Sequence, residues 1–555
     1  MQSFPSRLCA ESFHVVWLFD LTISESIDLR FRLIPFHSVG FSNCSITKGI
    51  QLSNARFSGS LHLTKSKVDG EVDASSVRID GELNLTRSRF LGCVSLEDGS
   101  ITGQLRMDQA RFEKGLNLDY ATIGGSIVAL AGNRDRLRRF EAKHPISMRG
   151  CKIEKNVRLE QALVWCGGVE VSAETAYSID AKGANIAGSL DLVNSVIGGA
   201  IRIDEATVHG DVRFSRSTLF SANFSSRSGP RHGCRALLGR DVVVGGSLRL
   251  GPDCQFDGKV DLRGSTVDGD LDLRSSEFSA HATLRGETQP DALAVDLGFT
   301  RVHGITFLRN WEPMDENEFA TPSRQFRVRG LLSLRMAHSD MISDRKDEWP
   351  PSLELNGFEY RDFSTNSQTG SVDRIAWLSR QPKIVAQPYT FLAEIYRRRG
   401  RHYDETQLLI ERERQLQKLR RRTLVEAAGS RDHVRSLLSF LDWLGHVALG
   451  WVVGHGYRPF YAGLWAVGAV LLFSGVFEYA HAIGYISSAA ERKDSCGEFS
   501  GLLYSSETFL PLLRLGYADC WVIARWVPIA KLIEALFGWV LAAFFVAGVS
   551  GVTRR

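Results

Sequence analysis

A glycine returns every eleven residues through the first half of the chain, and this period constrains the fold more than any other feature. The repeating unit reads Gly-x-Leu-x-Leu-x-x-Ser/Ala-x-Ile/Phe-x, as in Gly81–Phe90 and Gly103–Phe112. The glycines in register are Gly59, Gly70, Gly81, Gly92, Gly103 and Gly125, then Gly188, Gly199 and Gly210, then Gly258 and Gly269. A unit this short cannot bury its own leucines, so successive units must stack on one another.

The residues within one unit predict how it folds. Leu-x-Leu alternates with period two, which indicates a short strand with one buried face, and the Ser/Ala-x-Ile/Phe pair indicates a second strand. We expect the glycine to supply the corner between strands. Two units could close a four-sided coil, although a triangular coil is also open. The prediction is a mainly-β fold, a right-handed β-helix (β-solenoid) of 11-residue units.

The repeat resembles that of pentapeptide-repeat and bactofilin-like β-helices, although its inward positions alternate in spacing between five and six. Weaker rungs extend the predicted solenoid over residues 46–365, with residues 1–45 as an N-terminal cap or irregular segment. These rungs are Val157–Leu159, Ile179–Ala181, Leu248–Leu250, Val295–Leu297, Leu332–Leu334 and Leu353–Leu355. Insertions near residues 128–148, 222–240 and 309–328 are expected to form loops on one face.

Residues 366–430 change to a helical pattern and predict a basic helical hairpin. Pro388 suits the first turn of one helix, Gly400 ends it, and a second helix is expected from Asp404 to Arg422. The pattern resembles a single tetratricopeptide-type hairpin. Twelve Lys or Arg residues lie between Arg397 and Arg435. Arg420, Arg421 and Arg422 are predicted to contact anionic membrane lipids, or else to act only as a positive-inside topology signal. Scarce aromatic residues disfavour nucleic acid.

Residues 431–555 predict a membrane domain with two transmembrane helices, 460–477 and 535–552, each a charge-free apolar run. Residues 437–453 are expected to form an interfacial helix, with a third span as the alternative. Arginines flank both outer ends of this domain, so both termini are expected in the cytoplasm of a bacterium, with a multi-pass anchor in the inner (plasma) membrane. Cys496 and Cys520 lie in the outer loop, where they could form a disulfide or remain free thiols.

The loop at residues 500–520 carries a pore-like sequence, Gly516-Tyr517-Ala518-Asp519. The order of elements resembles that of a two-helix potassium channel: a span, a short helix, a Gly-Tyr-x-Asp loop and a second span. In that family the filter is lined by backbone carbonyls. Here Arg514 takes the place of the filter threonine and Ala518 that of its second glycine. These departures predict a degenerate pore, gated by the solenoid, which would require a homo-oligomer because two spans cannot enclose a channel.

An ordered set of motifs supports a second resemblance: Leu355–Tyr360, Trp377–Gln381, Gln387–Tyr396, Gly456–Pro459 and Gly538-Trp539. This set is similar to bacterial proteins, common in actinomycetes, that are named membrane-associated oxidoreductases, and it implies a redox activity without implying catalytic residues.

The residues themselves contain no Gly-x-Gly-x-x-Gly fingerprint, no Cys-x-x-Cys and no His-Glu-x-x-His. We therefore predict no catalytic, cofactor-binding or metal-ligating residues and no cofactor. The favoured function is a non-catalytic membrane-anchored scaffold or sensor, whose solenoid surface binds an unknown protein partner.

Overall fold

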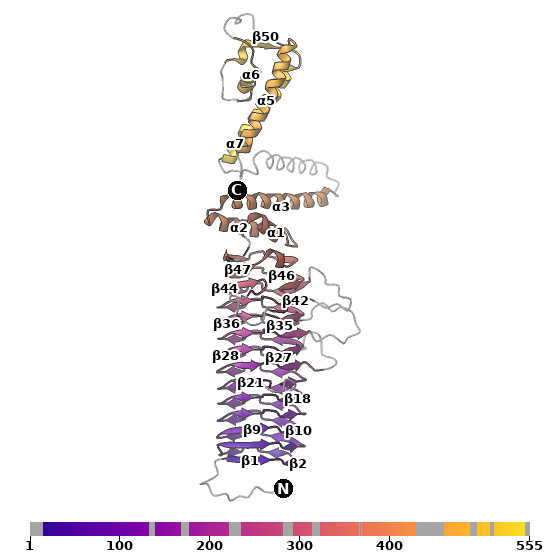
Figure 1. Ribbon diagram of the computed structural model, residues 1–555, viewed down its shortest axis with the longest axis vertical. Helices are drawn as coiled ribbons and strands as arrows, with labels where there is room; N and C mark the ends of the chain where they lie inside the picture. Colours follow the sequence, from indigo (N-terminus) through magenta and orange to yellow (C-terminus); the bar gives the residue numbers. More distant parts are fainter. Residues whose placement is uncertain are drawn as a thin grey trace. The chain divides into compact units, whose positions relative to one another are not determined.

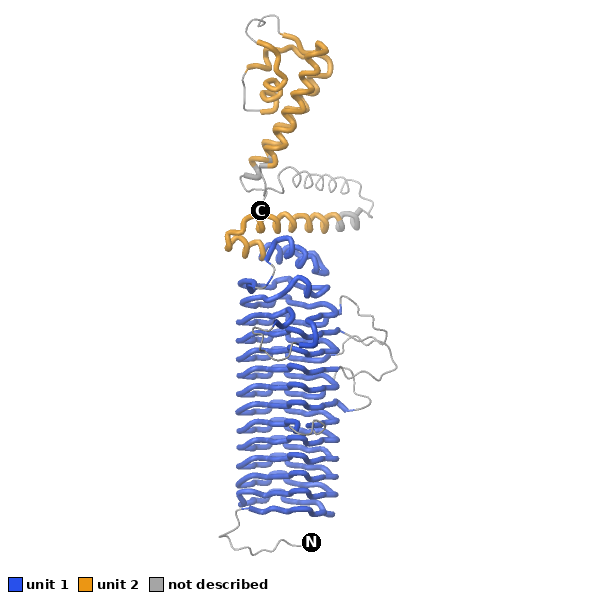
Figure 2. The backbone as a smooth tube through the Cα atoms, viewed as in Figure 1, with its two compact units in different colours: residues 1–391 blue, residues 392–555 orange. Residues whose placement is uncertain are grey.

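The structure is a computed structural model. It describes residues 15–132, 139–167, 177–220, 235–280, 292–312, 322–365, 367, 369–428, 460–488, 497–510 and 516–549. The chain divides into two compact units, residues 1–391 and residues 392–555 (Figure 2).

The first unit is a stack of parallel strands wound into coils (Figure 1). One coil passes through β12 (Arg78–Ile79), β13 (Leu83–Asn84), β14 (Arg89–Phe90) and β15 (Val94–Ser95), and β16 (Ser100–Ile101) then returns to pair with β12. Ile79 lies opposite Ile101, so a coil takes two 11-residue units. Four strands per turn show that the coil is four-sided. The β-solenoid prediction is confirmed at this level, and the right-handed sense of the coil stays a prediction.

The described strands form four ladders, one along each side. The first contains β4 (Leu33–Ile34), β8 (Arg56–Phe57), β12, β16, β20 (Thr122–Ile123), β24 (Lys152–Ile153), β28 (Asn185–Ile186), β32 (Thr207–Val208), β36 (Val243–Val244), β40 (Thr266–Val267) and β44 (Arg301–Leu308). The second contains β1 (Val15–Phe19), β5 (Ser38–Ser42), β9 (Ser60–Thr64), β13, β17 (Leu105–Arg106), β21 (Ile127–Ala129), β25 (Val157–Leu159), β29 (Leu190–Asp191), β33 (Val212–Arg213), β37 (Leu248–Arg249), β41 (Leu271–Asp272), β44, β47 (His338–Asp344) and β49 (Glu359–Phe363). Because β44 pairs with both β40 and β41, it joins these two ladders into one sheet.

The other two ladders form separate sheets. The third contains β2 (Thr22–Ile23), β6 (Ser45–Ile46), β10 (Lys67–Val68), β14, β18 (Arg111–Phe112), β22 (Glu141–Ala142), β26 (Leu163–Trp165), β30 (Val196–Gly198), β34 (Thr218–Phe220), β38 (Gln255–Asp257), β42 (Glu277–Ser279) and β45 (Arg327–Arg329). The fourth contains β3 (Ile27–Asp28), β7 (Gly49–Gln51), β11 (Glu71–Asp73), β15, β19 (Leu116–Asn117), β23 (Ile146–Ser147), β27 (Tyr177–Asp180), β31 (Ala200–Arg202), β35 (Arg235–Leu238), β39 (Lys259–Asp261), β43 (Leu293–Asp296), β46 (Leu331–Ser333) and β48 (Ser352–Glu354).

The ladders reach beyond the clearest repeats at both ends. All six weaker rungs overlap strands, namely β25, β27, β37, β43, β46 and β48. We expected residues 1–45 to form a cap or an irregular segment, and within them β1 already pairs with β5 in register from Val15. Of the expected insertions, residues 133–138, 221–234 and 313–321 lie outside the described residues. The expected ranges were too long, because β22 and β23 lie within 128–148, β35 lies within 222–240 and β45 begins within 309–328.

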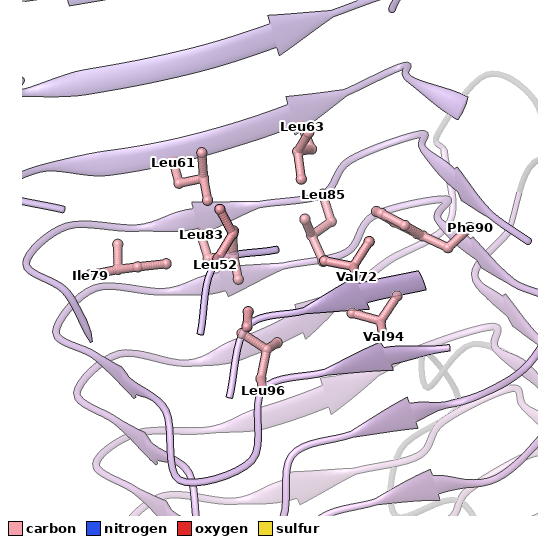
Figure 3. A pocket seen from close by; sticks show the side chains of 11 residues that line it. Leu52, Leu61, Leu63, Val72, Ile79, Leu83, Leu85, Phe90, Val94 and Leu96 are labelled. Atoms are coloured by element: carbon pink, nitrogen blue, oxygen red, sulfur yellow. The ribbon is translucent and has the colours of Figure 1, made fainter. Parts of the chain in front are cut away.

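The interior of the coils is filled by apolar side chains. Figure 3 shows the leucines and valines of neighbouring coils pointing toward one another, and the void between them is about 10 Å³, close to the smallest space that admits one water. Phenylalanines stack along one column, with 5.1 Å between the ring centroids of Phe90 and Phe112 and 5.0 Å between those of Phe256 and Phe278. This part of the solenoid therefore offers no internal ligand cavity.

The corner residue is a different one from the glycine that we predicted. A left-handed backbone conformation recurs every eleven residues, at Asn43, Asn54, Lys65, Ser76, Arg87, Asp98, Gln109 and Tyr120. Gly81 and Gly103 do not adopt it. A Cβ on Gly103 would instead lie 2.7 Å from the carbonyl oxygen of Gly81, and the Gly103 amide donates to that same oxygen at 2.9 Å. Gly103 is thus required for close contact between coils, and in this part of the solenoid non-glycine residues make the corners. The in-register Gly199 and Gly258 differ, because they have positive φ, of +133° and +144°.

The short 3-10 helix η1 (Lys346–Glu348) lies between β47 and β48 of the solenoid. The helical region that follows the solenoid contains α1 (Ser371–Leu378), α2 (Gln387–Arg398) and α3 (His402–Ala428). Pro388 lies in the first turn of α2, and Gly400, with φ of +70°, separates α2 from α3. The boundary between the two units falls within α2. Helices α2 and α3 lie where the two helices were predicted, and their packing as a hairpin stays a prediction. Helix α1 is an additional helix that the sequence pattern did not indicate.

The remaining elements of the second unit are α5 (Phe460–Ala482), β50 (Ile486–Ser488), α6 (Gly501–Phe509), η3 (Ala518–Cys520), β51 (Trp521–Ile523) and α7 (Val527–Val549). The strands β50 and β51 pair antiparallel and join the ends of the two long helices. Helix α5 extends past the predicted span 460–477, and α7 begins before the predicted span 535–552. The expected interfacial helix, residues 437–453, lies outside the described residues.

Candidate functional site

The long helices of the second unit have strongly apolar exposed surfaces. Among the described residues one helical segment, Tyr461–Ala482 in α5, is long and apolar enough to cross a membrane. Leu471 and Leu472 on α5, and Leu532 and Leu536 on α7, are all exposed. Exposed apolar surfaces of this kind are typical of regions that contact lipid or a partner.

The short helix α6 packs against both long helices. Phe477 of α5, Tyr504 of α6 and Val527 of α7 belong to one buried cluster, while Ala469, Phe509 and Leu541 belong to a second. Gly538 on α7 permits this approach, because a Cβ there would lie 2.1 Å from the carbonyl oxygen of Phe509. The three helices therefore form one packed group, which we call the hairpin core.

Helix α6 is anchored at its first residue by α5. The Glu478 carboxylate accepts a hydrogen bond from the Gly501 amide at 2.6 Å, where the free amides of a helix start attract negative charge. The carboxylate thus satisfies an amide that has no partner within the helix.

Glu507, two turns along α6, holds the Gly-Tyr-Ala-Asp loop. Its two carboxylate oxygens accept the amides of Gly516 and Ala518, each at 2.7 Å. Tyr517 is fastened on the other side, since its hydroxyl accepts the Ser500 amide at 2.7 Å and donates to the Glu498 carbonyl at 2.9 Å. The loop is therefore bound on both sides to the segment that carries α6.

The backbone of this loop turns immediately after Gly516, which has φ of +73°. Residues Ala518–Cys520 form the turn η3, and the Cys520 amide donates to the Tyr517 carbonyl at 3.2 Å. In an ion filter the carbonyls face the conduction path. Here the carbonyl of Tyr517 is occupied within the loop, so the resemblance to a potassium channel covers the order of elements and not the filter conformation.

A second buried carboxyl lies deeper in the hairpin core. Glu534 on α7 is fully buried and contacts the hydroxyl of Ser505 on α6, and that hydroxyl is also 3.0 Å from the Val470 carbonyl oxygen on α5. The other oxygen of Glu534 and the hydroxyl of Tyr504 are buried without a hydrogen-bond partner.

The predicted site residues fall in three places. Gly516, Tyr517, Ala518 and Asp519 lie together at the loop, but Arg514 is outside the described residues. Cys520 is disulfide-bonded, and its partner also lies outside them, so pairing with Cys496 stays a prediction. Arg420 and Arg421 are exposed on α3, while the side chain of Arg422 is not described.

Sequence reasoning missed the glutamates that hold the hairpin core: Glu478, Glu507 and Glu534. The available signal was an acidic residue within or beside an apolar run, which is unfavourable in a membrane unless the residue has a specific partner. Their partners are backbone amides and a serine, which are not recognisable as a motif.

Within the described part of the solenoid, the thiols of Cys151 and Cys254 are buried, and burial raises the pKa of each to about 12. Thiols in this state are poor nucleophiles and poor metal ligands. No group of three metal-ligating side chains occurs among the described residues. These cysteines therefore serve as small apolar side chains of the core.

Comparison of the chain with protein-family models, with curated proteins and with solved structures finds no match in any of the three.

Proposed function

We propose that the protein is a non-catalytic scaffold or sensor, tethered to the bacterial plasma membrane by its C-terminal hairpin, with the outer surface of the solenoid as its binding surface. The observation that carries this proposal is the packed interior of the coils, with a void of about 10 Å³ between Leu61, Leu83 and their neighbours. A filled interior leaves the outer faces of the ladders as the surface that a partner can reach.

The charge of that surface supports a protein partner better than a polyanion. Exposed arginines pair with acids on the same or the next coil, such as Arg89 with Glu113 at 2.8 Å and Arg78 with Asp80 at 3.0 Å. Nucleic acid requires unneutralised positive charge along its path. The mixed, regularly spaced charges instead suit a partner with complementary charges of both signs.

The tether rests on the exposed leucines of α5 and α7. We propose two spans, with both termini in the cytoplasm and with Arg420, Arg421 and Arg422 beside anionic headgroups. Replacement of both Leu471 and Leu536 by Asp should release the full-length protein from the membrane fraction. As a matched control, Leu419→Asp, at an exposed leucine of α3, should leave it membrane-bound.

The binding surface can be tested with a photo-crosslinking residue placed on each side of the solenoid in the full-length protein in cells. Suitable outward positions are Arg78, Arg89, Arg106 and Asn117, one on each ladder. A scaffold with a defined surface should crosslink to the same protein from one or two sides, and reversal of a charge there should abolish the adduct. Equal crosslinking from all four sides, or none, would contradict the proposal.

The alternative of a degenerate pore remains a prediction, and so does the redox activity implied by the second resemblance. For the pore, Tyr517 already uses its carbonyl within the loop, which disfavours a conducting filter. The first measurement is the mass of the detergent-solubilised protein, which gives its oligomeric state. A monomer excludes a channel, because two spans cannot enclose one. If it is a closed ring, conductance of Arg514→Thr beside the natural chain tests for conduction. Absorbance of the purified protein tests for a bound flavin or nicotinamide.

A further inference from the structure

Ser505, on α6, brings all three helices of the hairpin core together at one point. Its hydroxyl oxygen lies 3.0 Å from the Val470 carbonyl oxygen of α5 and within hydrogen-bond distance of a carboxyl oxygen of Glu534 on α7. Ser505 and Glu534 are both fully buried. This contact is polar in an otherwise apolar core.

The number of protons at this point is decided by simple counting. A serine hydroxyl carries one hydrogen and can donate to one acceptor. A carbonyl oxygen has no hydrogen, and an ionised carboxylate has none either, so an ionised Glu534 would leave one of the two short contacts without a proton. A protonated Glu534 resolves this, because it donates to Ser505 while Ser505 donates to Val470.

Burial of Glu534 favours the same state, while the nearby charge of Lys531 opposes it without pairing with the acid. Lys531, one turn before it on α7, lies 5.1 Å from the ring centroid of Tyr504, and the structure shows no ion pair between Lys531 and Glu534 among the described residues. The titratable groups of α6 are Tyr504, whose hydroxyl has no hydrogen-bond partner, and Glu507, whose carboxylate accepts the loop amides. On α5 the facing group is the Val470 carbonyl, while Glu478 binds the start of α6. A buried carboxylate without a paired cation is far more costly than a buried carboxylic acid.

We propose that Glu534 is a proton-binding site of the hairpin core, which holds a neutral acid at neutral pH and joins α7 to α6 and α5 through the chain Glu534–Ser505–Val470. Loss of the proton places an unpaired charge between the helices and weakens their packing. The hairpin thereby responds to pH. The inference goes beyond the scaffold function and does not depend on it.

The direct test is infrared spectroscopy of the full-length protein in lipid nanodiscs at pH 7. A protonated carboxyl has a C=O stretching band separate from the carboxylate bands. We expect this band in the natural chain and its loss in Glu534→Gln, which keeps the shape of the acid without a titrating proton. Glu507→Gln is the matched control and should leave the band in place, since Glu507 accepts two amides and needs no proton.

Two further measurements test the proposal even if the Glu534→Gln variant fails to fold. Ser505→Ala retains Glu534 and should shift the frequency of the band, because the acid loses its acceptor. In the full-length protein, the melting temperature of the hairpin should fall as the pH rises from 6 to 9. In the Ser505→Ala variant this melting temperature should be lower than in the natural chain at every pH. A spectrum without the band at pH 7, or a band unchanged in both Glu534→Gln and Ser505→Ala, would overturn the proposal.

Discussion

Arg374 donates from its two terminal nitrogens to the two carboxylate oxygens of Asp344, each at 2.7 Å, and both side chains are buried. Asp344 ends β47, one of the last strands of the solenoid, and Arg374 lies in α1. The guanidinium carbon is 3.7 Å from the ring centroid of Phe363, and Trp349 donates its indole N–H to Asp344 at 2.8 Å. The ion pair thus fastens α1 to the C-terminal coils.

Arg374→Met should destabilise the end of the solenoid by about 3–5 kcal/mol, because it leaves a buried carboxylate without its cation. Hydrogen exchange of the β47 and β49 amides in the full-length protein measures this local stability. Lys152→Met removes an exposed pair with Glu154 and should change the stability by less than about 1 kcal/mol. Equal exchange rates in the two variants would contradict a structural role for the pair.

Asp261 is a second fully buried acid, and it lies among three cations on the outer side of β39. Its oxygens accept Arg263 at 2.9 Å and Arg240 at 2.8 Å, and Lys259 is 3.4 Å away. Burial opposes the charge, but hydrogen bonds from Arg263 and Arg240 outweigh it and hold the pKa of Asp261 at about 2.

Because this pKa is depressed, the stabilisation by Asp261 is present above about pH 4 and is lost as the pH falls through about 2. Asp261→Asn should therefore cost about 2 kcal/mol at pH 7, and the difference from the natural chain should shrink toward pH 2. Denaturant titrations at pH 7, 4 and 2.5 measure it. Asp98→Asn, at an exposed corner, is the control and should have little effect at any of these pH values.

Gly103→Ala should destabilise the solenoid by about 1–3 kcal/mol, because its Cβ would lie 2.7 Å from the Gly81 carbonyl oxygen and would force two coils apart. Ser76→Gly is the opposite case. Ser76 has φ of +55°, so glycine there should be neutral or stabilising by up to about 1 kcal/mol. Thermal denaturation of both variants tests the assignment of corner and contact positions. A larger loss in Ser76→Gly than in Gly103→Ala would reverse it.

Phe112→Ala should cost about 3–5 kcal/mol, since the ring is fully buried between Phe90 and Phe140 and its removal leaves a cavity that stacked coils cannot close. Phe112→Leu should cost less because it fills most of that space. Tyr120→Ala, at an exposed corner, serves as the surface control. Chemical denaturation ranks the three, and any other order would argue against a rigid core.

Glu507→Ala should release the Gly-Tyr-Ala-Asp loop. Hydrogen bonds to a charged acceptor contribute about 1.5–3 kcal/mol, so the Gly516 and Ala518 amides should exchange about ten to a hundred times faster. Thr508→Ala on the same helix removes only a hydroxyl that donates to the Tyr504 carbonyl, and it should leave both amides protected. Unchanged exchange in Glu507→Ala would show that the loop is held by other contacts.

The strands of the solenoid were predictable because each depends on residues a few positions apart. Leu-x-Leu buries one face of a strand wherever it occurs. The pairing of Ile79 with Ile101, two units along, depends in addition on the four-sided coil, which the sequence left open. The corner assignment failed because the spacing of a glycine does not reveal whether it turns the chain or admits a neighbour. That distinction requires the position of the neighbouring coil. At Gly103 the deciding observation is that a Cβ would lie too close to the Gly81 carbonyl oxygen.

The hairpin core was predictable only in outline. Apolar composition indicated the long helices and the Gly-Tyr-x-Asp pattern indicated the loop, since both are properties of a local segment. Glu507 and Glu534 were not identified, because the structural role of a carboxyl group depends on which amides or hydroxyls lie beside it in the folded chain. Glu507 receives two N–H donors, whereas the buried Glu534 meets a serine hydroxyl that also contacts the Val470 carbonyl.

The amino-acid sequence by itself determined a coiled stack of short strands, because a strict period makes every unit pack on its neighbours in one way. It also determined an apolar helical end. Tertiary structure alone decided how the stack is closed and how the hairpin is held. Arg374 meets Asp344 across 30 residues and Ser505 meets Glu534 across 29, and neither separation belongs to a repeat. Such pairs form because a buried polar group must find its hydrogen-bond partners within the protein, and only the folded chain specifies which partners those are.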